Sequence, residues 1–319
     1  MMRVVVTGAT GLIGRPLVRA LRARGDSVVA LVRDEARARR ALGPGLADVE
    51  LEGANLEEPG RWQARLAADA VVHLAGEPIA ARRLDARQKQ RVRDSRVEST
   101  RVIVEGLEAL APAARPRVLV TASGIDYYGF ANRQLDDDDP VAEDAPCGDE
   151  FLARVCQAWE AEAVHAEALG IRVVRMRTAV VLAPPSAGGA LAKMVTPFKL
   201  FAGGRIGSGQ QWFSWIHRDD VVAAYVAAIS DERWRGPVNL VGPESVRNQE
   251  FARALGKALH RPAWMPVPAF AVRLATGELA ESLLEGRRAV PAALERLGFA
   301  FAHPTVADAL GASFDAEPS

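Results

Sequence analysis

Short apolar runs alternate along this chain with segments whose apolar residues recur at helical spacing. Residues 3–7, RVVVT, are β-branched and apolar without alternation, which is typical of a strand buried on both faces of a parallel sheet. Residues 13–24 repeat their apolar positions with the period of a helix, and residues 27–32 form a second apolar run. The N-terminus therefore predicts a strand–helix–strand unit.

The same alternation continues downstream. The expected elements are a third short strand before residue 53, strands within 69–78, 117–123 and 172–185, a returning strand before 241, and helices at 85–111, 149–170, 217–229 and 248–260. Strands that alternate with helices define the α/β class, here a doubly wound parallel sheet of the Rossmann type with a smaller C-terminal α/β lobe.

The pattern changes after the sixth strand, and this change predicts the domain division. Residues 186–211 are rich in glycine and are expected to be mostly loop. We expect a dinucleotide-binding domain at 1–185, rejoined by 216–241. A small C-terminal lobe for substrate would then consist of 186–215 and 242–319.

Three glycines at the first turn indicate a site for a phosphate group. Gly8, Gly11 and Gly14 lie between the first strand and the first helix. The first permits a tight turn, the second lets backbone approach a phosphate, and the third allows close helix packing. A helix N-terminus also offers unpaired N–H groups, so the turn predicts a pyrophosphate site, to which Thr10, Leu12 and Ile13 also belong.

The residue after the second strand predicts which dinucleotide binds. A site for NAD places Asp or Glu about 20 residues beyond the glycines, where it holds the ribose 2′-hydroxyl. This chain has Arg33 there, followed by Asp34, which we expect to turn away, and by Arg37 and Arg39. A guanidinium pairs with a 2′-phosphate that a carboxylate would repel, so we expect NADP(H).

The glycine spacing, Gly-x-x-Gly-x-x-Gly after Thr7, resembles the extended branch of the short-chain dehydrogenase/reductase superfamily. The resemblance implies that Asn55 and Leu56 lie beside the adenine, although a plain polar turn explains them equally well. Small residues at Leu74-Ala75-Gly76 would let the chain pass under the cofactor. We interpret His73, just before that turn, as a packed strand histidine.

The superfamily's catalytic pair is missing. Its Tyr-x-x-x-Lys motif, in which lysine lowers the pKa of the tyrosine, falls on Leu152 and Cys156 in the helix expected at 149–170. The resemblance leaves Ser123 at the end of the fifth strand, with Tyr127 and Tyr128 behind it, as the candidate catalytic residues. A thiol in the middle of a helix is usually a small core residue, although Cys156 as an acid or nucleophile stays open.

Two long motifs narrow the resemblance. They are GGALAKMVTPFKLFAGGRIGSGQQWFSWIHRDD at 188–220 and GPVNLVGPESVRNQEFARALGKALHRPAWMPVPAF at 236–270. They resemble an atypical, epimerase-like branch that ends in a conserved tail of unassigned role. The resemblance runs from residue 3 to about 310. It implies a Rossmann fold and NADP(H), and it names no substrate.

Within the second lobe, three further residues allow two interpretations each. Trp212 and Trp215 are lobe core or pocket wall, and we favour core. His217 beside two carboxylates could form a catalytic dyad, but Asp219 or Asp220 as helix N-cap already explains the pattern.

Composition limits the remaining function classes. The chain has 40 basic and 40 acidic residues among 319, so its net charge attracts neither nucleic acid nor an anionic membrane. Cys147 and Cys156 match no metal spacing, which favours a reducing cytoplasmic setting without a metal. A homodimer is expected only by analogy.

Two functions stay open from the sequence. One is an NADP(H)-dependent oxidoreductase or epimerase-like enzyme acting on a small molecule of unknown identity. The other is an NADP(H)-binding protein with little or no catalysis, serving as a sensor or partner-binding module.

Overall fold

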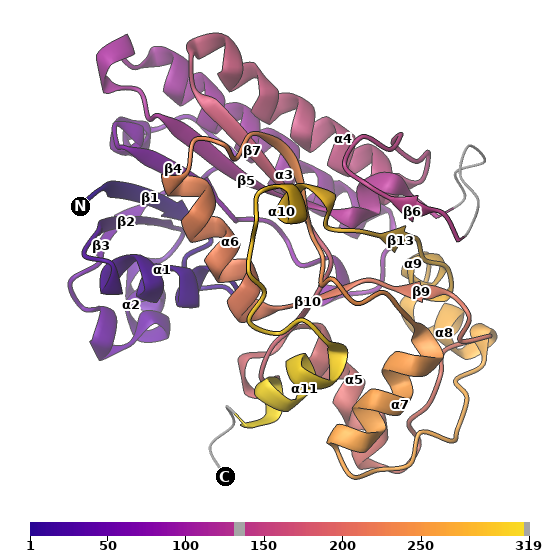
Figure 1. The fold of residues 1–319 in the computed structure, drawn as a ribbon. Coiled ribbons are helices and arrows are strands. Elements are labelled where there is room, and N and C mark those ends of the chain that lie inside the picture. Colours follow the sequence, from indigo (N-terminus) through magenta and orange to yellow (C-terminus); the bar gives the residue numbers. More distant parts are fainter. Residues whose placement is uncertain (131–137, 316–319) are drawn as a thin grey trace.

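A seven-stranded parallel sheet forms the centre of the molecule in the computed structural model, which describes residues 1–130 and 138–315 (Figure 1). The strand order is β3-β2-β1-β4-β5-β7-β11. The strands are β1 (Arg3–Thr7), β2 (Ser27–Val32), β3 (Glu50–Gly53), β4 (Ala70–His73), β5 (Val118–Gly124), β7 (Arg172–Thr178) and β11 (Gly236–Leu240). This confirms the predicted α/β Rossmann fold.

Helices cover both faces of the sheet (Figure 1). Val4 and Val6 of β1 pack in a cluster with α1 (Gly14–Ala23) and α6 (Arg218–Ser230). Val5 points to the other face, where α3 (Ala86–Ala109) and α4 (Phe151–Val164) contribute the apolar side chains. Successive strand residues face opposite sides, which explains why β1 is an unbroken apolar run.

Most of the predicted helices end within two residues of the observed bounds, but two details differ from the prediction. The helix expected at 149–170 ends at Val164 and continues as a 3₁₀ turn to Leu169. At α6, the N-cap is His217 rather than Asp219 or Asp220, because its imidazole Nδ1 accepts the N–H of Asp219 at 3.2 Å.

The segment expected to be mostly loop, 186–211, contains a helix, α5 (Gly189–Lys199). Leu191, Val195 and Phe198 are buried from this helix at helical spacing, so its apolar stripe outweighs the glycines that precede it. They pack with α7 (Asn248–Ala258) and α11 (Val306–Asp315) around Trp215.

As predicted, Trp215 is fully buried in this cluster of α5, α7 and α11, which we name the lobe cluster. Trp212 does not belong to the core. The Trp212 ring is half-buried beneath the guanidinium of Arg247, which lies 3.8 Å from the ring centroid. Its indole Nε1 donates to Asp138 at 3.1 Å, so polar and charged partners surround the ring in place of apolar ones.

The remaining strands and α-helices are short. They are β6 (Pro140–Val141), β8 (Val180–Leu182), β9 (Trp212–Phe213), β10 (Trp215–His217), β12 (Val246–Arg247), β13 (Arg288–Ala289), α8 (Ala269–Thr276), α9 (Leu279–Leu284) and α10 (Ala292–Arg296), with α2 (Glu35–Leu42) in the first half. Residues of α10 join the main core and those of α11 join the lobe cluster. The division into two domains stays a prediction. In the part of the chain that the structure describes, no helix combines the length and apolarity needed to cross a bilayer.

Candidate active site and dinucleotide site

The glycine turn has the close backbone approaches that its sequence suggests. Gly8 has φ +66°, and a Cβ there would lie 2.9 Å from the Ala75 nitrogen. A Cβ on Gly14 would lie 2.1 Å from the Gly8 carbonyl oxygen. Side chains at these positions are therefore excluded by backbone, not by flexible neighbours.

Unpaired amides surround this turn. Gly11 N–H donates to the Gly8 carbonyl at 3.0 Å. Across the described residues, the N–H groups of Leu12 and Ile13 have no hydrogen-bond partner. Together with the start of α1 at Gly14, they form a positive concavity that suits a diphosphate.

The lobe lies against the same turn. A Cβ on Gly189, at the start of α5, would lie 2.9 Å from Leu12 Cδ2. Lys193, one turn further, donates to the Ala80 carbonyl at 2.5 Å. The first turn of α5 therefore borders the predicted pyrophosphate site.

Arg33 is exposed directly after β2. Its neighbour Asp34 caps α2 by accepting the Arg37 N–H at 2.9 Å, so this carboxylate is used locally, as expected. The Arg39 guanidinium donates to the Ala47 carbonyl at 2.9 Å. Of these residues, Arg33 is the one that directly follows the strand end, where the ribose 2′ position is expected.

A polar chain fixes the loop after β4. The Thr7 hydroxyl accepts the N–H groups of Leu74 and Ala75, each at 3.1 Å. Its proton then goes to His73 Nδ1 at 2.7 Å, and His73 Nε2 donates to Ser99 at 3.1 Å. Burial lowers the pKa of His73 to about 3, so the ring is neutral. This confirms His73 as a packed strand histidine.

The adenine-side residues allow both original interpretations. The Asn55 side chain is exposed and accepts the Glu57 N–H at 3.3 Å, as in a polar turn. Leu56 packs partly against the α3 side of the core. The cofactor roles of Asn55 and Leu56 stay predictions.

The three candidate catalytic residues meet at one buried ion pair. Arg177 of β7 and Glu160 of α4, each 3% exposed, form hydrogen bonds of 2.8 and 2.9 Å. Ser123 donates to the same carboxylate at 2.7 Å. The Arg177 guanidinium also lies 3.5 Å from the Tyr127 ring centroid and donates to the Tyr128 hydroxyl at 3.0 Å.

Tyr127 and Tyr128 differ in access. Tyr128 is fully buried, its hydroxyl donates to Asn239 at 2.6 Å, and burial raises its pKa to about 12. Tyr127 is half-buried, and burial raises its pKa as well. Deprotonation of either phenol is therefore disfavoured near neutral pH.

A second buried carboxyl lies close to the end of β5. Asp126, just after β5, lines a small cavity of about 70 Å³ together with Leu152 and Ala153 of α4. Burial raises the pKa of Asp126, and the Arg96 guanidinium partly opposes this rise. Burial also raises the pKa of Cys156 to about 12, so its thiol stays protonated.

The sequence analysis missed Asp126, Glu160, Arg177 and Arg96. A signal existed for Arg177, because β7 reads RVVRMRT and places charge inside an otherwise buried strand. Arg96 of α3 has no such signal, because this helix carries many charged residues. The Arg96 guanidinium donates to the Glu77 carbonyl at 2.9 Å and lies 5.3 Å from the Trp159 ring centroid.

His217 has a structural role at the start of α6. Beyond capping the helix, its ring packs edge-on against His303 at a centroid distance of 4.0 Å. Burial lowers the pKa of His217 to about 4. Asp220 accepts the N–H groups of Ala302 and His303, so these residues join the C-terminal segment to the sheet domain.

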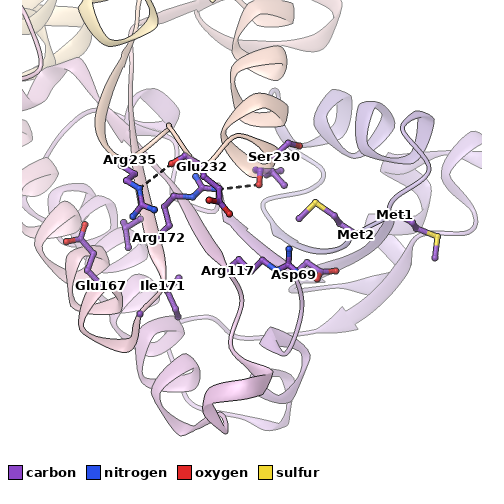
Figure 2. Close-up of a pocket in the computed structure, with 13 residues that line it drawn as sticks. Met1, Met2, Asp69, Arg117, Glu167, Ile171, Arg172, Ser230, Glu232 and Arg235 are labelled. Carbon is purple, nitrogen blue, oxygen red and sulfur yellow. Dashed lines mark hydrogen bonds between the residues drawn. The ribbon is translucent and has the colours of Figure 1, made fainter. Parts of the chain in front are cut away.

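A larger depression, of about 820 Å³, lies at the amino ends of the strands, opposite the glycine turn (Figure 2). Asp69, Arg117 and Arg172 border it at the amino ends of the strands. The Arg172 guanidinium is used structurally, because it donates to three main-chain carbonyls. Parallel α/β sheets bind ligands at the carboxyl ends, so we do not assign the dinucleotide here.

The strand order, the glycine turn and the unpaired amides define a dinucleotide-binding protein of the Rossmann class. The model of the NAD dependent epimerase/dehydratase family matches residues 4–241, and that of a domain of unknown function, DUF1731, matches residues 267–313. The chain belongs to the NAD dependent epimerase/dehydratase family. The atypical extended branch predicted from the motifs is thereby confirmed.

Individual relatives match over nearly the whole chain. The chloroplastic SDR39U1 homologue of Arabidopsis thaliana, an epimerase family protein, is 39% identical over 98% of this chain and 86% of its own. An epimerase family protein of Mycobacterium bovis is 41% identical over 97% and 96%. The crystal structure of human epimerase family protein SDR39U1, isoform 2, with NADPH is similar at TM-score 0.83 and 32% identity, covering 99% and 100% of the two chains.

Proposed function

We propose that this chain is an NADP(H)-dependent oxidoreductase or epimerase-like enzyme in which Asp126 exchanges a proton with the substrate. The observation that carries the proposal is the cavity shared by Asp126 and Leu152 at the carboxyl end of β5. Leu152 occupies the position of the superfamily's tyrosine, so a titratable carboxyl lies where the phenol is missing.

Three features support NADP(H) as the cofactor. The amides of Leu12 and Ile13 would bind the diphosphate, and Arg33 would pair with the 2′-phosphate. The human relative of similar structure was solved with NADPH. The bound cofactor supplies or accepts a hydride at its nicotinamide.

The residues of the chain then handle the proton. In the oxidative direction, the Asp126 carboxylate accepts the proton of a substrate hydroxyl while that carbon loses hydride, and a carbonyl forms. In the reverse direction, the carboxylic acid returns the proton to the carbonyl oxygen. Burial raises the pKa of Asp126, which makes the carboxylate a stronger base than an exposed one.

Ser123, Tyr127 and Tyr128 remain proposed contributors. Ser123 lies at the end of β5, and release from Glu160 would free its hydroxyl for a substrate oxygen. Tyr127 is the more accessible phenol. Tyr128, engaged with Asn239 and Arg177, fits a positioning role better than proton transfer.

A second function, cofactor binding without turnover, is favoured by one observation. The hydroxyls of Ser123 and Tyr128 are both held in the network around the Arg177–Glu160 pair. A protein whose only task is to bind NADP(H) would need no free catalytic group. We also keep as predictions a homodimer and, from two free cysteines, a cytoplasmic location.

The test is turnover of a panel of carbonyl compounds and sugar nucleotides, followed through NADPH absorbance and isomer analysis. With an active compound found, Asp126→Asn should lower kcat about 100-fold or more and leave NADPH affinity unchanged. Asp149→Asn, which alters an exposed carboxylate before α4, is the matched control. Full activity of Asp126→Asn would contradict the role of Asp126, and complete inertness of wild type across the panel would favour the binder.

The variant Tyr128→Phe distinguishes a positioning role of Tyr128 from a catalytic role. A loss of stability with kcat retained would assign the phenol to positioning. A loss of kcat at unchanged stability would make it a catalytic residue instead.

A further inference from the structure

Exposed apolar side chains of the described residues gather in one part of the C-terminal lobe. Among the described residues seven large hydrophobic residues are exposed, and six of the seven lie at 200–201 and 264–274. The six are Leu200, Phe201, Trp264, Met265, Phe270 and Leu274. Single exposed hydrophobics are ordinary, but a concentration of this kind marks an interaction surface.

The two segments lie side by side. Met265 N–H donates to the Gly203 carbonyl at 3.2 Å, and Val267 N–H donates to the Arg205 carbonyl at 2.8 Å. The Arg261 guanidinium lies 4.7 Å from the Phe201 ring centroid. The two segments therefore form one surface, which we name the apolar face.

Helix α8 extends the apolar face. It begins at Ala269, two residues after Val267, near α9 in Figure 1. Phe270 and Leu274 are one helical turn apart and are 72% and 76% exposed, whereas Val272 is buried. The helix thus presents two large apolar side chains to solvent where a packed helix would present polar ones.

Basic residues predominate in the segments that form the apolar face. Residues 188–213 and 251–277 contain no Asp or Glu. Their basic residues, all exposed, are Lys193, Lys199, Arg205, Arg253, Lys257, Arg261 and Arg273. Lys199, Arg205, Arg261 and Arg273 lie in or next to the segments of the apolar face, so a chain that is neutral overall carries a local excess of positive charge there.

Neighbouring acidic groups neutralise only part of this charge. Arg273 pairs with Glu281 of α9 at 2.9 Å, and α9 is flanked by Glu278 and Glu285. Arg205 and Arg261 donate to main-chain carbonyls, and no carboxylate among the described residues forms an ion pair with either of them.

We propose that the apolar face binds the surface of an anionic lipid bilayer. Trp and Phe favour the interface between headgroups and acyl chains, and basic side chains around them attract anionic headgroups. A second copy of this chain is disfavoured as occupant, because a twofold contact would bring two cationic regions together. The expectation of no membrane attraction followed from net charge, which conceals this local excess.

Trp264 makes the proposal directly measurable. It is 66% exposed, whereas Trp62, Trp159, Trp215 and Trp234 are each at most 5% exposed. Trp212 is half-buried beneath Arg247, so the emission is recorded in a Trp212→Phe background. Vesicles of phosphatidylcholine with phosphatidylglycerol should shift the emission to the blue and protect it from iodide. Brominated acyl chains in the same vesicles should quench it, and vesicles of phosphatidylcholine alone should do much less.

Variants test the two components separately. Leu274→Glu should abolish binding to the anionic vesicles, whereas Ala109→Glu, at an exposed position of α3, should bind as wild type does. Lys199→Gln should weaken binding about fivefold, because one basic residue near an anionic surface contributes about 1 kcal/mol. Circular dichroism establishes that each variant folds.

Three results would overturn the proposal. The first is no difference between anionic and neutral vesicles, and the second is unaltered binding by Leu274→Glu. The third is protection of Trp264 from iodide without vesicles in a species that light scattering shows to be a dimer, because the occupant would then be a second copy.

Discussion

The Arg177 guanidinium holds the Glu160 carboxylate through two hydrogen bonds, Nε to Oε1 at 2.8 Å and Nη2 to Oε2 at 2.9 Å. The pair joins β7 to α4 below the end of β5. Ser123 and Tyr128 are both bonded to it. The ion pair therefore fixes the positions of these two candidate catalytic side chains.

Glu160→Gln should lower the free energy of unfolding by about 3–5 kcal/mol, because Arg177 would keep a buried charge without its counter-ion. Urea denaturation measures the change. Glu105→Gln, which removes an exposed partner of Arg101, is the control and should leave the midpoint near that of wild type. An equal effect in the two variants would contradict the structural role of the buried pair.

Gly14→Ala should destabilise the glycine turn and abolish NADPH binding, because its Cβ would lie 2.1 Å from the Gly8 carbonyl oxygen. Gly311→Ala, in the middle of α11 where a Cβ meets nothing within 4 Å, should raise stability by about 0.5–1 kcal/mol. Thermal unfolding with and without NADPH compares the two. A Gly14→Ala protein that binds NADPH normally would remove the steric argument.

The buried histidines should make stability depend on pH below neutrality. The pKa of His73 is about 3 in the folded chain and about 6.5 in the unfolded one. Between these values the unfolded chain binds a proton that the folded chain does not. His73 therefore costs no stability above pH 6.5. Below pH 6.5 the free energy of unfolding falls by up to about 1.4 kcal/mol per pH unit, down to about pH 3.

The variant His73→Gln removes the part of the pH dependence that comes from His73. Denaturation between pH 4 and pH 6.5 should give a shallower pH dependence for the variant, while the dependence from His217 remains in both proteins. Parallel stability profiles would show that His73 is protonated in the folded state after all.

Local patterns were sufficient to predict the sheet domain. The unbroken apolar run of β1 and the helical spacing from Gly14 to Ala23 follow from burial on two faces and on one face. The glycine turn was predictable because most of its constraints are local: Gly11 and Gly14 are limited by the backbone of Gly8 and Ala9, and only Gly8 also meets the distant backbone after β4.

The candidate active site was harder to predict, because its contacts are distant in sequence. Tyr128 bonds to Asn239 and to Arg177, and no local pattern indicates either partner. The end of β5 directs attention to the phenols, but Asp126 lines the cavity because α4 brings Leu152 opposite it. The helix α5 was missed because the glycines before it outweighed its apolar stripe in the interpretation.

The most direct test of the central claim is calorimetric titration of wild type and Arg33→Ala with NADPH and with NADH. Wild type should bind NADPH more tightly. Arg33→Ala should weaken NADPH binding by about tenfold or more, as expected for loss of a charge-assisted hydrogen bond, and leave NADH binding unchanged. Absence of NADPH binding by wild type, or an unaltered preference in Arg33→Ala, would contradict the assignment of the glycine turn and Arg33 to NADP(H).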